Sequence, residues 1–371
     1  MFLLLPILLA HPAYAWPSAR GDAAQQGLAK ADLSSGLTVQ WSHRAGSPVK
    51  GTPAVDAEHV YVGTESGALL AVYRSDGELS WRFDTEATVE GGPLLVGDHV
   101  VFGSHDGHLR AVSRKDGTLA WSRYLGDRVG APPNLMPVEG GPGLILIGAH
   151  DGKLHAIDPS DGTSTWSYTT GNAIQGGAAF NGAQIIQGSC DGAVHVLSPK
   201  GEPLHRVEVG AWVGASVAAT STLVVAPHFG NAVHAFNPAT GEARWTFRDQ
   251  LFPFHAAPAL SDDLVVVGGR DRVVRGLDPT SGKERWSFVA GGKVDAGLVI
   301  AGDGVLVAAA DGRLTVLSAA TGEEQSSVDL GGALLDGPAV YDGQVYIGSA
   351  DGGLHALAPK PAAPQAKKDP T

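Results

Sequence analysis

The sequence predicts an all-β protein, a single eight-bladed β-propeller, from three observations. A short phrase recurs eight times, a tryptophan follows most copies at a fixed distance, and a tryptophan-bearing strand precedes the first copy. The clearest copy begins at Asp151-Gly152, and its second residue recurs at intervals of 39–45 residues. A period of about 40 with strand-like content is typical of propeller blades. The second residues are Gly67, Gly107, Gly152, Gly192, Asn231, Arg272, Gly312 and Gly352.

Each unit contains four predicted strands separated by turns. A hairpin turn such as Asp342-Gly343 separates the first two strands, and the repeated Asp-Gly phrase separates the second from the third. A further turn such as Thr240-Gly241 leads into the fourth strand. No segment has the sustained apolar spacing of a helix. We therefore expect four antiparallel strands in each blade.

The tryptophans of the fourth strands indicate how the ring closes. The eighth phrase has no fourth strand after it, whereas the segment 38–42, which carries Trp41, has no blade of its own. We therefore predict that this N-terminal strand completes the last blade, which removes exposed sheet edges. Packing between neighbouring blades explains the indoles, with a cost of about 3–5 kcal/mol for Trp-to-Ala changes. The predicted blade tryptophans are Trp41, Trp81, Trp121, Trp166, Trp245 and Trp286, whereas His205 and Ser326 take this place in two units.

The chain outside the repeats divides into three predicted segments. Residues 1–15 contain an apolar run and the A-x-A-like end Ala13-Tyr14-Ala15, so we predict a signal peptide and export. Residues 16–36 are expected to be a linker, residues 37–358 the propeller, and residues 359–371 a disordered tail. No cysteine follows the apolar run, so we expect a periplasmic or envelope-associated protein without a lipid anchor.

Charge and cysteine content exclude several classes of function. The net charge is −12 and no cluster of lysine or arginine occurs within the repeats, which argues against binding to nucleic acid or anionic lipid. Cys190 is the single cysteine, so no intramolecular disulfide can form. No nucleophile elbow, phosphate-binding glycine loop or metal-ligand signature occurs.

The run from Ala156 to Trp166 resembles the repeat of pyrroloquinoline-quinone-type (PQQ-like) propellers, approximately A-x-D-x-x-T-G-x-x-x-W. Segments 235–245 and 277–286 match the same pattern. The resemblance implies one of two functions. Quinoprotein dehydrogenases of this type hold pyrroloquinoline quinone and Ca²⁺ in the central funnel, but they are usually much longer and often carry two adjacent cysteines. Compact, non-catalytic propellers such as the outer-membrane assembly factor BamB resemble this chain in length and eight-unit plan.

We therefore expect a non-catalytic protein-binding scaffold of the bacterial cell envelope, not an enzyme, with outer-membrane protein assembly as its setting. Under this hypothesis the chain is a monomer without a cofactor, inserts no segment into the membrane, and binds an envelope protein such as a β-barrel assembly component. The alternative is a reduced quinoprotein oxidoreductase with pyrroloquinoline quinone and calcium in the funnel.

Residues that open the first strand of each blade are the candidate partner-binding rim. The first strands lie nearest the axis of a propeller, so these residues face one mouth of the channel. Carboxylates beside a lysine could bind a cation or a basic segment of a partner, or they could form a solvated mouth with mutually compensating charges. The rim candidates are Lys50, Glu90, Gln175, His255, Asp295 and Asp336.

Two other groups have alternative interpretations. Four histidines share one position in the third strand, but blades about 10 Å apart cannot easily bring them to one metal, so we expect inter-blade packing with hydrogen bonds. Trp212 and segment 251–254 offer exposed apolar surface, although Leu251, Phe252 and Phe254 could equally plug the channel or pack between blades. The four histidines are His155, His195, His234 and His355.

Overall fold

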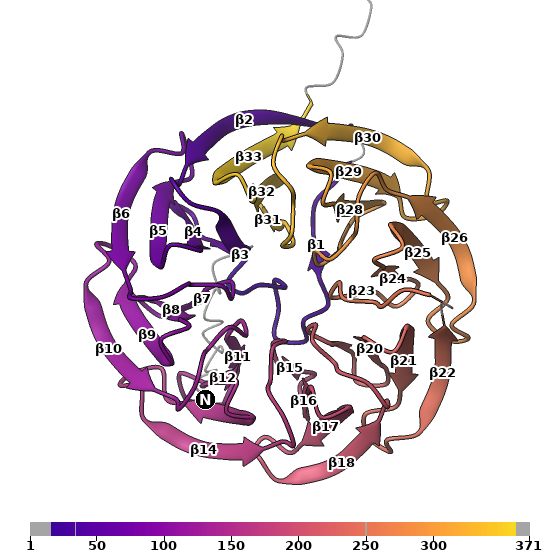
Figure 1. The fold of residues 1–371 in the computed structure, drawn as a ribbon, viewed down its shortest axis with the longest axis horizontal. Helices are drawn as coiled ribbons and strands as arrows, with labels where there is room; N and C mark the ends of the chain where they lie inside the picture. The colour runs from indigo at the N-terminus through magenta and orange to yellow at the C-terminus, as the bar shows by residue number, and fades with distance from the viewer. Residues whose placement is uncertain (1–15, 34, 249–250, 361–371) are drawn as a thin grey trace, which may run out of the picture.

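Eight β-sheets surround a common axis in residues 16–33, 35–248 and 251–360, which the computed structural model describes (Figure 1). Each sheet contains four antiparallel strands, and one also carries a short fifth strand. The all-β, eight-bladed propeller is therefore confirmed. Within the described ranges, no helix has the length and apolar character needed to cross a membrane.

The first four blades follow one another along the chain. Blade 1 contains β3 (Val49–Val55), β4 (His59–Thr64), β5 (Ala68–Tyr73) and β6 (Leu79–Asp84). Blade 2 contains β7 (Leu94–Val96), β8 (His99–Gly103), β9 (His108–Ser113) and β10 (Leu119–Tyr124). Blade 3 contains β11 (Asn134–Met136), β12 (Leu144–Gly148), β13 (Lys153–Ile157) and β14 (Ser164–Thr169). Blade 4 contains β15 (Ala179–Phe180), β16 (Ile185–Gly188), β17 (Ala193–Leu197) and β18 (Pro203–Glu208).

The remaining blades include the two that take strands from the N-terminal region. Blade 5 contains β19 (Ala218–Ala219), β20 (Val224–His228), β21 (Ala232–Phe236) and β22 (Ala243–Arg248). Blade 6 contains β23 (Ala259–Leu260), β24 (Val265–Gly268), β25 (Val273–Leu277) and β26 (Glu284–Val289). Blade 7 contains β27 (Val299–Ala301), β28 (Gly304–Ala308), β29 (Arg313–Ser318), β30 (Glu324–Asp329) and β1 (Leu28–Ala29). Blade 8 contains β31 (Ala339–Tyr341), β32 (Gln344–Gly348), β33 (Gly353–Pro359) and β2 (Leu37–Arg44).

Ring closure depends on strands from opposite ends of the chain. Strand β2 pairs antiparallel with β33, from Leu37 opposite Pro359 to Arg44 opposite Gly353. In Figure 1 the N-terminal β2 lies outside β33 and next to β30 of blade 7. The predicted closure by an N-terminal strand is therefore confirmed.

The blade tryptophans connect each blade to the next. Trp81 Nε1 donates to the carbonyl oxygen of Arg114 at 2.9 Å, and its ring covers Gly117 in blade 2. Trp166 covers Gly201 in the same way, although its Nε1 has no hydrogen-bond partner among the described residues. These contacts hold the indoles against the neighbouring blade. The same hydrogen bond joins Trp41 to Arg74 (2.9 Å), Trp121 to Pro159 (3.0 Å), Trp245 to Pro279 (2.8 Å) and Trp286 to Ala319 (2.9 Å).

Replacing Gly117 with alanine is expected to destabilise the protein by about 2–5 kcal/mol. Gly117 has φ of +71°, and a Cβ there would lie 2.7 Å from Cε3 of Trp81. Gly343, with φ of +72° but no atom within 4 Å of a Cβ, is the matched control, and its change to alanine should cost only about 1–2 kcal/mol. Urea unfolding measures both variants, and equal losses would contradict the proposed packing of Trp81 on Gly117.

The segment 16–33 crosses the inside of the ring, whereas the sequence predicts a linker there. Its carbonyl oxygens accept hydrogen bonds from backbone N–H groups at equivalent positions of the innermost strands. Because these strands present an unpaired edge to the axis, an extended segment can satisfy them whatever its side chains. The donor and acceptor pairs are Val55 to Trp16 (2.9 Å), Leu95 to Pro17 (2.7 Å), Phe180 to Ala23 (2.7 Å), Ala219 to Ala24 (3.0 Å), Leu260 to Gln26 (2.9 Å) and Ile300 to Gly27 (2.9 Å).

Side chains fix the same segment in place. Trp16 and Leu33 are buried in the core, and Asn134 of blade 3 donates through Nδ2 to the carbonyl oxygen of Ala23 at 2.8 Å. Strand β1 then pairs parallel with β27. We call residues 16–29 the axial segment. The predicted signal peptide lies outside the described residues, as does the predicted tail except for Pro359 and Lys360.

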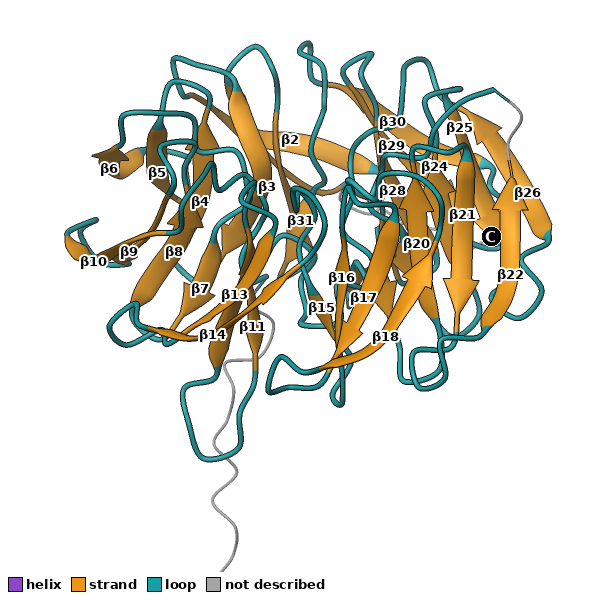
Figure 2. Cartoon of the chain, turned by 60° about the horizontal axis from the view of Figure 1, so that its bottom comes forward, coloured by secondary structure: helices purple, strands orange, loops and turns teal. Residues whose placement is uncertain are grey.

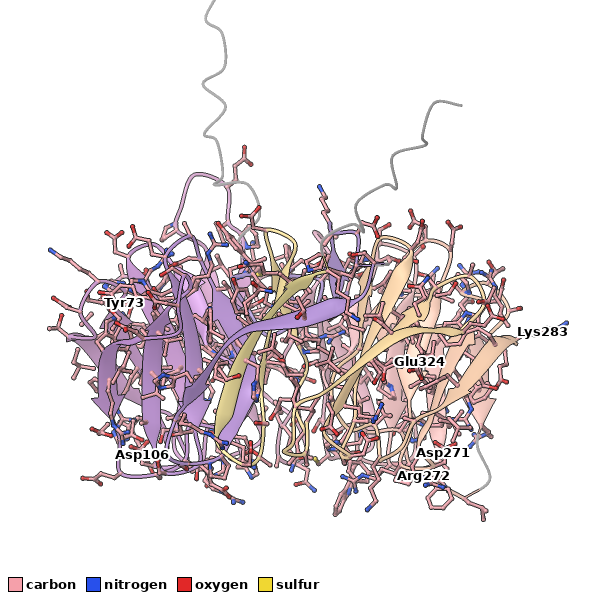
Figure 3. All side chains as sticks on the ribbon, turned by 90° about the horizontal axis from the view of Figure 1, so that it is seen from above. Tyr73, Asp106, Asp271, Arg272, Lys283 and Glu324 are labelled. Atoms are coloured by element: carbon pink, nitrogen blue, oxygen red, sulfur yellow. The ribbon has the colours of Figure 1, made fainter. Side chains whose placement is uncertain are left out.

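The two faces of the disc carry different loops. In Figure 3, Asp106, Asp271 and Arg272, which belong to the repeated turns, lie at one face. The loop between β11 and β12 projects from the ring in Figure 2. The loops between blades and the repeated turns together surround the mouth of an axial cavity.

Candidate functional site

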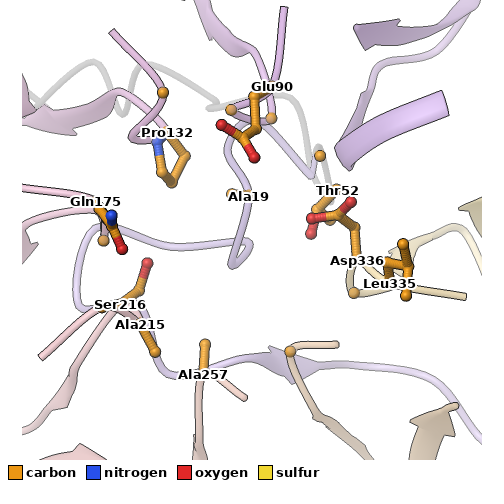
Figure 4. A pocket seen from close by; sticks show the side chains of 18 of the residues that line it. Ala19, Thr52, Glu90, Pro132, Gln175, Ala215, Ser216, Ala257, Leu335 and Asp336 are labelled. Carbon is orange, nitrogen blue, oxygen red and sulfur yellow. The ribbon is translucent and has the colours of Figure 1, made fainter. Parts of the chain in front are cut away.

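The residues that open the innermost strands surround a cavity of about 460 Å³ on the ring axis. Glycine and other small residues, including Thr52 and Ser216, form much of its wall, and Ala19 of the axial segment lies in its centre (Figure 4). The cavity is therefore closed from one side by the N-terminal part of the chain.

Five of the six predicted rim residues line this cavity: Glu90, Gln175, His255, Asp295 and Asp336. Figure 4 shows Glu90, Gln175 and Asp336 around it. Lys50 does not belong to the lining. It is held in the ladder between β3 and β4 opposite Gly63, because β3 is longer than the other innermost strands.

Charges around the cavity are largely paired. His105 Nε2 lies 2.7 Å from Glu90 Oε2, and Arg270 Nε donates to Asp295 Oδ1 at 2.8 Å. His255 Nδ1 lies 3.8 Å from the same Asp295 oxygen. The arrangement agrees with a mouth of mutually compensating charges, and it also leaves hydrogen-bonding groups available to a ligand.

Four charged or titratable lining residues lie outside the predicted rim: Arg20, His105, Arg128 and His150. His105 and His150 occupy the position before the repeated Asp-Gly turn, so alignment of the units could have placed them at the mouth. Burial lowers the pKa of His150, and the nearby Arg128 guanidinium lowers it further. Arg20 has no repeat position, and nothing in its sequence context predicts its place in the ring.

The third-strand histidines that have hydrogen-bond partners bond within their own blade or to the preceding blade. His195 Nε2 lies 3.0 Å from Asp191 Oδ2, and its Nδ1 lies 3.0 Å from the Tyr168 hydroxyl. His355 Nδ1 lies 2.8 Å from the Ser42 hydroxyl of β2. Among the described residues, no group of three or more His, Cys, Asp or Glu side chains is placed to hold a metal ion.

An exposed apolar patch adjoins the cavity at blades 5 and 6. Trp212 is 59% exposed and Leu251 76%. The Trp212 ring contacts Phe229 with centroids 6.3 Å apart, and Phe229 contacts His255 at 5.2 Å. For segment 251–254 the sequence left two alternatives, plugging the channel or packing between blades. Phe254 is buried between blades, whereas Leu251 and Phe252 are exposed.

Changing Asp336 to asparagine should alter the pH dependence of stability. Burial raises the pKa of this carboxyl from 3.8 to about 6, although a backbone N–H of Gly51 and the charge of Lys50 oppose the shift. The folded protein therefore holds a proton that the unfolded chain releases, and stability falls as pH rises from 3.8 to about 6. Since Asp336 also faces the cavity, solvent reduces the effect, and we expect the free energy of unfolding to fall by on the order of 1–2 kcal/mol over this pH range.

Urea unfolding at several pH values measures this effect. The Asp336→Asn variant should lack this fall in stability and should exceed the parent protein in stability at pH 7. The exposed Asp98→Asn variant is the control and should keep the parent profile. An unchanged slope in Asp336→Asn would show that the carboxyl is not desolvated in the folded ring.

The fold and the cavity define a class: an eight-bladed propeller whose axial cavity is lined by paired charges and small residues. A family model described as outer membrane protein assembly factor BamB matches residues 27–190, 150–289 and 270–363. The chain belongs to this family of PQQ-like propellers. No curated protein matches its sequence significantly.

Solved structures from different functional groups share the fold. BamB from Moraxella catarrhalis is 20% identical, with a TM-score of 0.70 and coverage of 87% of this chain and 98% of that one. The computationally designed Ika8 protein is 19% identical, with a TM-score of 0.75 and coverages of 86% and 99%. Quinohemoprotein alcohol dehydrogenase from Comamonas testosteroni is 15% identical, with a TM-score of 0.79 and coverages of 95% and 82%. At these identities the likeness concerns the fold alone.

The cavity lining does not suit pyrroloquinoline quinone with calcium. The quinone is a flat tricarboxylate, and the described residues of the lining include no tryptophan, tyrosine or phenylalanine that could stack on it. Glu90, Asp295 and Asp336 would repel its carboxylates. Ca²⁺ takes 6–8 oxygen ligands, whereas among the described residues no three His, Cys, Asp or Glu side chains are grouped to hold a metal ion.

Proposed function

We propose that the chain is a non-catalytic protein-binding scaffold of the bacterial cell envelope that acts in outer-membrane protein assembly. Family membership supports this setting, and the chain would be exported as a monomer without a cofactor. The observation that carries the proposal is the mouth surface, which we define as Glu90, His255, Asp295, Trp212 and Phe252. It joins exposed aromatic groups to charged groups on one rigid ring, the combination typical of a protein-recognition surface.

The partner would be an envelope protein, such as a β-barrel assembly component. Carboxylates of the mouth would bind its basic groups, and Trp212 with Phe252 would bury its apolar groups. The outermost strands of the blades offer a second mode, in which an extended segment adds to an exposed edge.

Charge reversal at the mouth tests the proposal. A photo-crosslinking residue at position 212 should capture a defined envelope protein in cells, identified by mass spectrometry. The double variant Glu90→Lys with Asp295→Lys should lose this capture. The matched control is Glu324→Lys with Asp329→Lys, which reverses two exposed charges on β30 and should retain it. Equal capture by both double variants would contradict recognition by the mouth surface.

A titration separates the scaffold from the alternative of a reduced quinoprotein oxidoreductase. Pyrroloquinoline quinone and Ca²⁺ are added to the full chain, and quinone absorbance and dye-linked alcohol oxidation are followed. If the chain is a scaffold, we expect neither stoichiometric binding of the quinone nor oxidation of the alcohol. Tight binding of the quinone with turnover of the alcohol would contradict the scaffold and support the oxidoreductase.

A further inference from the structure

The floor of the axial cavity contains a buried arginine that the ring satisfies only in part. Arg20 is 3% exposed and borders the cavity. Its Nη2 donates to the carbonyl oxygens of Pro258, at 2.8 Å, and Leu298. Its Nε and Nη1 have no hydrogen-bond partner among the described residues. Because an unpaired buried donor costs free energy, these groups favour an acceptor from outside the chain.

The unpaired Nη1 group lies at the cavity wall. A Cβ added to Gly297, which also borders the cavity, would lie 2.4 Å from Nη1. Since glycine has no side chain, the guanidinium packs directly against residue 297 at the cavity wall, where Nη1 is buried. A carboxylate in the cavity would reach Nη1 through a small local shift of this contact. Any larger residue at position 297 would displace the guanidinium or cover it.

The guanidinium keeps its charge although it is buried. Burial lowers the pKa of Arg20 to about 10, and the nearby Asp22 carboxylate partly opposes this shift. Asp22 itself accepts a hydrogen bond from the backbone N–H of Gln26 at 3.1 Å. A positive group with unpaired, buried donors therefore borders the cavity at neutral pH.

We propose that the cavity floor is a binding site for a single carboxylate group, held by Arg20 and supplied by a small organic acid or by the C-terminus of a peptide. Guanidinium groups bind carboxylates through short, charge-assisted hydrogen bonds. Glu90, Asp295 and Asp336 line the same cavity, so the ligand carries one negative charge, with a neutral or cationic remainder. The cavity of about 460 Å³ is within the size range of small-ligand sites.

Calorimetric titration of the full chain tests this site with matched pairs of probes. Acetate is compared with acetamide, and the tripeptide Gly-Gly-Gly with its C-terminal amide. The carboxylate of at least one pair should bind and its amide should not. Binding of acetate identifies a small acid as sufficient, whereas binding of the tripeptide alone identifies a peptide C-terminus.

The Arg20→Gln variant should bind the carboxylate at least about tenfold more weakly, because a hydrogen bond to a charged group contributes a factor of about ten or more. Arg128→Gln is the matched control, since it removes the same charge from the same cavity near the mouth. It should retain most of the affinity. Equal affinity in Arg20→Gln, or equal binding of acid and amide, would overturn the proposal.

A spectroscopic measurement on the unmodified protein covers the case in which Arg20→Gln fails to fold. In ¹⁵N-labelled protein, acetate or the tripeptide should shift the amide resonances of Gly297 and Leu298, and the corresponding amide probe should not. Absence of these shifts would overturn the site. The result is independent of partner capture at the mouth surface, so either proposal can fail without the other.

Discussion

A chain that begins at residue 45 is expected to lose the folded monomer. It lacks β2, so all of β33 becomes an exposed edge and blade 8 keeps three strands. It also lacks Trp41, which bonds to Arg74, covers Gly77 in blade 1 and lies 6.1 Å from Tyr346 in blade 8. The tryptophan alone is worth about 3–5 kcal/mol, and each lost ladder hydrogen bond adds about 0.5–1.5 kcal/mol.

These losses are comparable with the whole stability of a typical domain, about 5–15 kcal/mol. We therefore expect aggregation or exchange of strands between copies. Size-exclusion chromatography with light scattering measures the outcome. A chain that begins at residue 37 keeps β2 and is the control. Recovery of a cooperative monomer from the chain that begins at residue 45 would show that seven complete blades suffice.

The chain that begins at residue 37 should fold with an open channel and lose several kcal/mol of stability. It lacks seven backbone hydrogen bonds to the innermost strands, the six that the segment accepts and one that Trp16 N–H donates to Val55, each worth about 0.5–1.5 kcal/mol. Burial of Trp16 and Leu33 contributes about 1.5–3 kcal/mol for each side chain. Release of the ordered segment regains part of the loss as chain entropy.

Urea unfolding of this chain, compared with one that begins at residue 16, measures the contribution of residues 16–36, which include the axial segment. A synthetic peptide of residues 16–36, added in trans, should restore part of the lost stability by binding the folded ring only. A peptide of the same composition in scrambled order is the control. Identical urea midpoints for the two chains would show that residues 16–36 do not stabilise the ring.

The ring could be predicted from sequence because residues within each blade mark where its strands begin and end. The turns at Gly107 and Gly152 and the indoles at Trp81 and Trp121 serve local needs, a left-handed backbone and a buried aromatic contact. Each of these structural requirements restricts the residue type at its position, and each recurs in successive repeats. The closing strand could be inferred because the eighth repeat lacks a fourth strand, whereas the strand that carries Trp41 has no blade of its own.

The axial segment could not be predicted, for the opposite reason. Its contacts with the innermost strands use backbone carbonyl groups, for example those of Pro17, Ala23 and Gly27, which every residue type possesses. The same limit applies to Arg20. Its place at the cavity floor follows from the path of the segment and not from any property of the repeat. Alignment of the strand-opening residues placed Glu90 and Asp336 in the cavity, but it failed for Lys50, where β3 is longer.

The pairing of β2 with β33 constrains the order of assembly. Residues 37–44 leave the ribosome more than 300 residues before the strand that they join. Until the last residues arrive, this strand has no native strand partner, and contacts so distant along the chain form slowly. Synthesis therefore holds the nascent chain in a state open to misassociation.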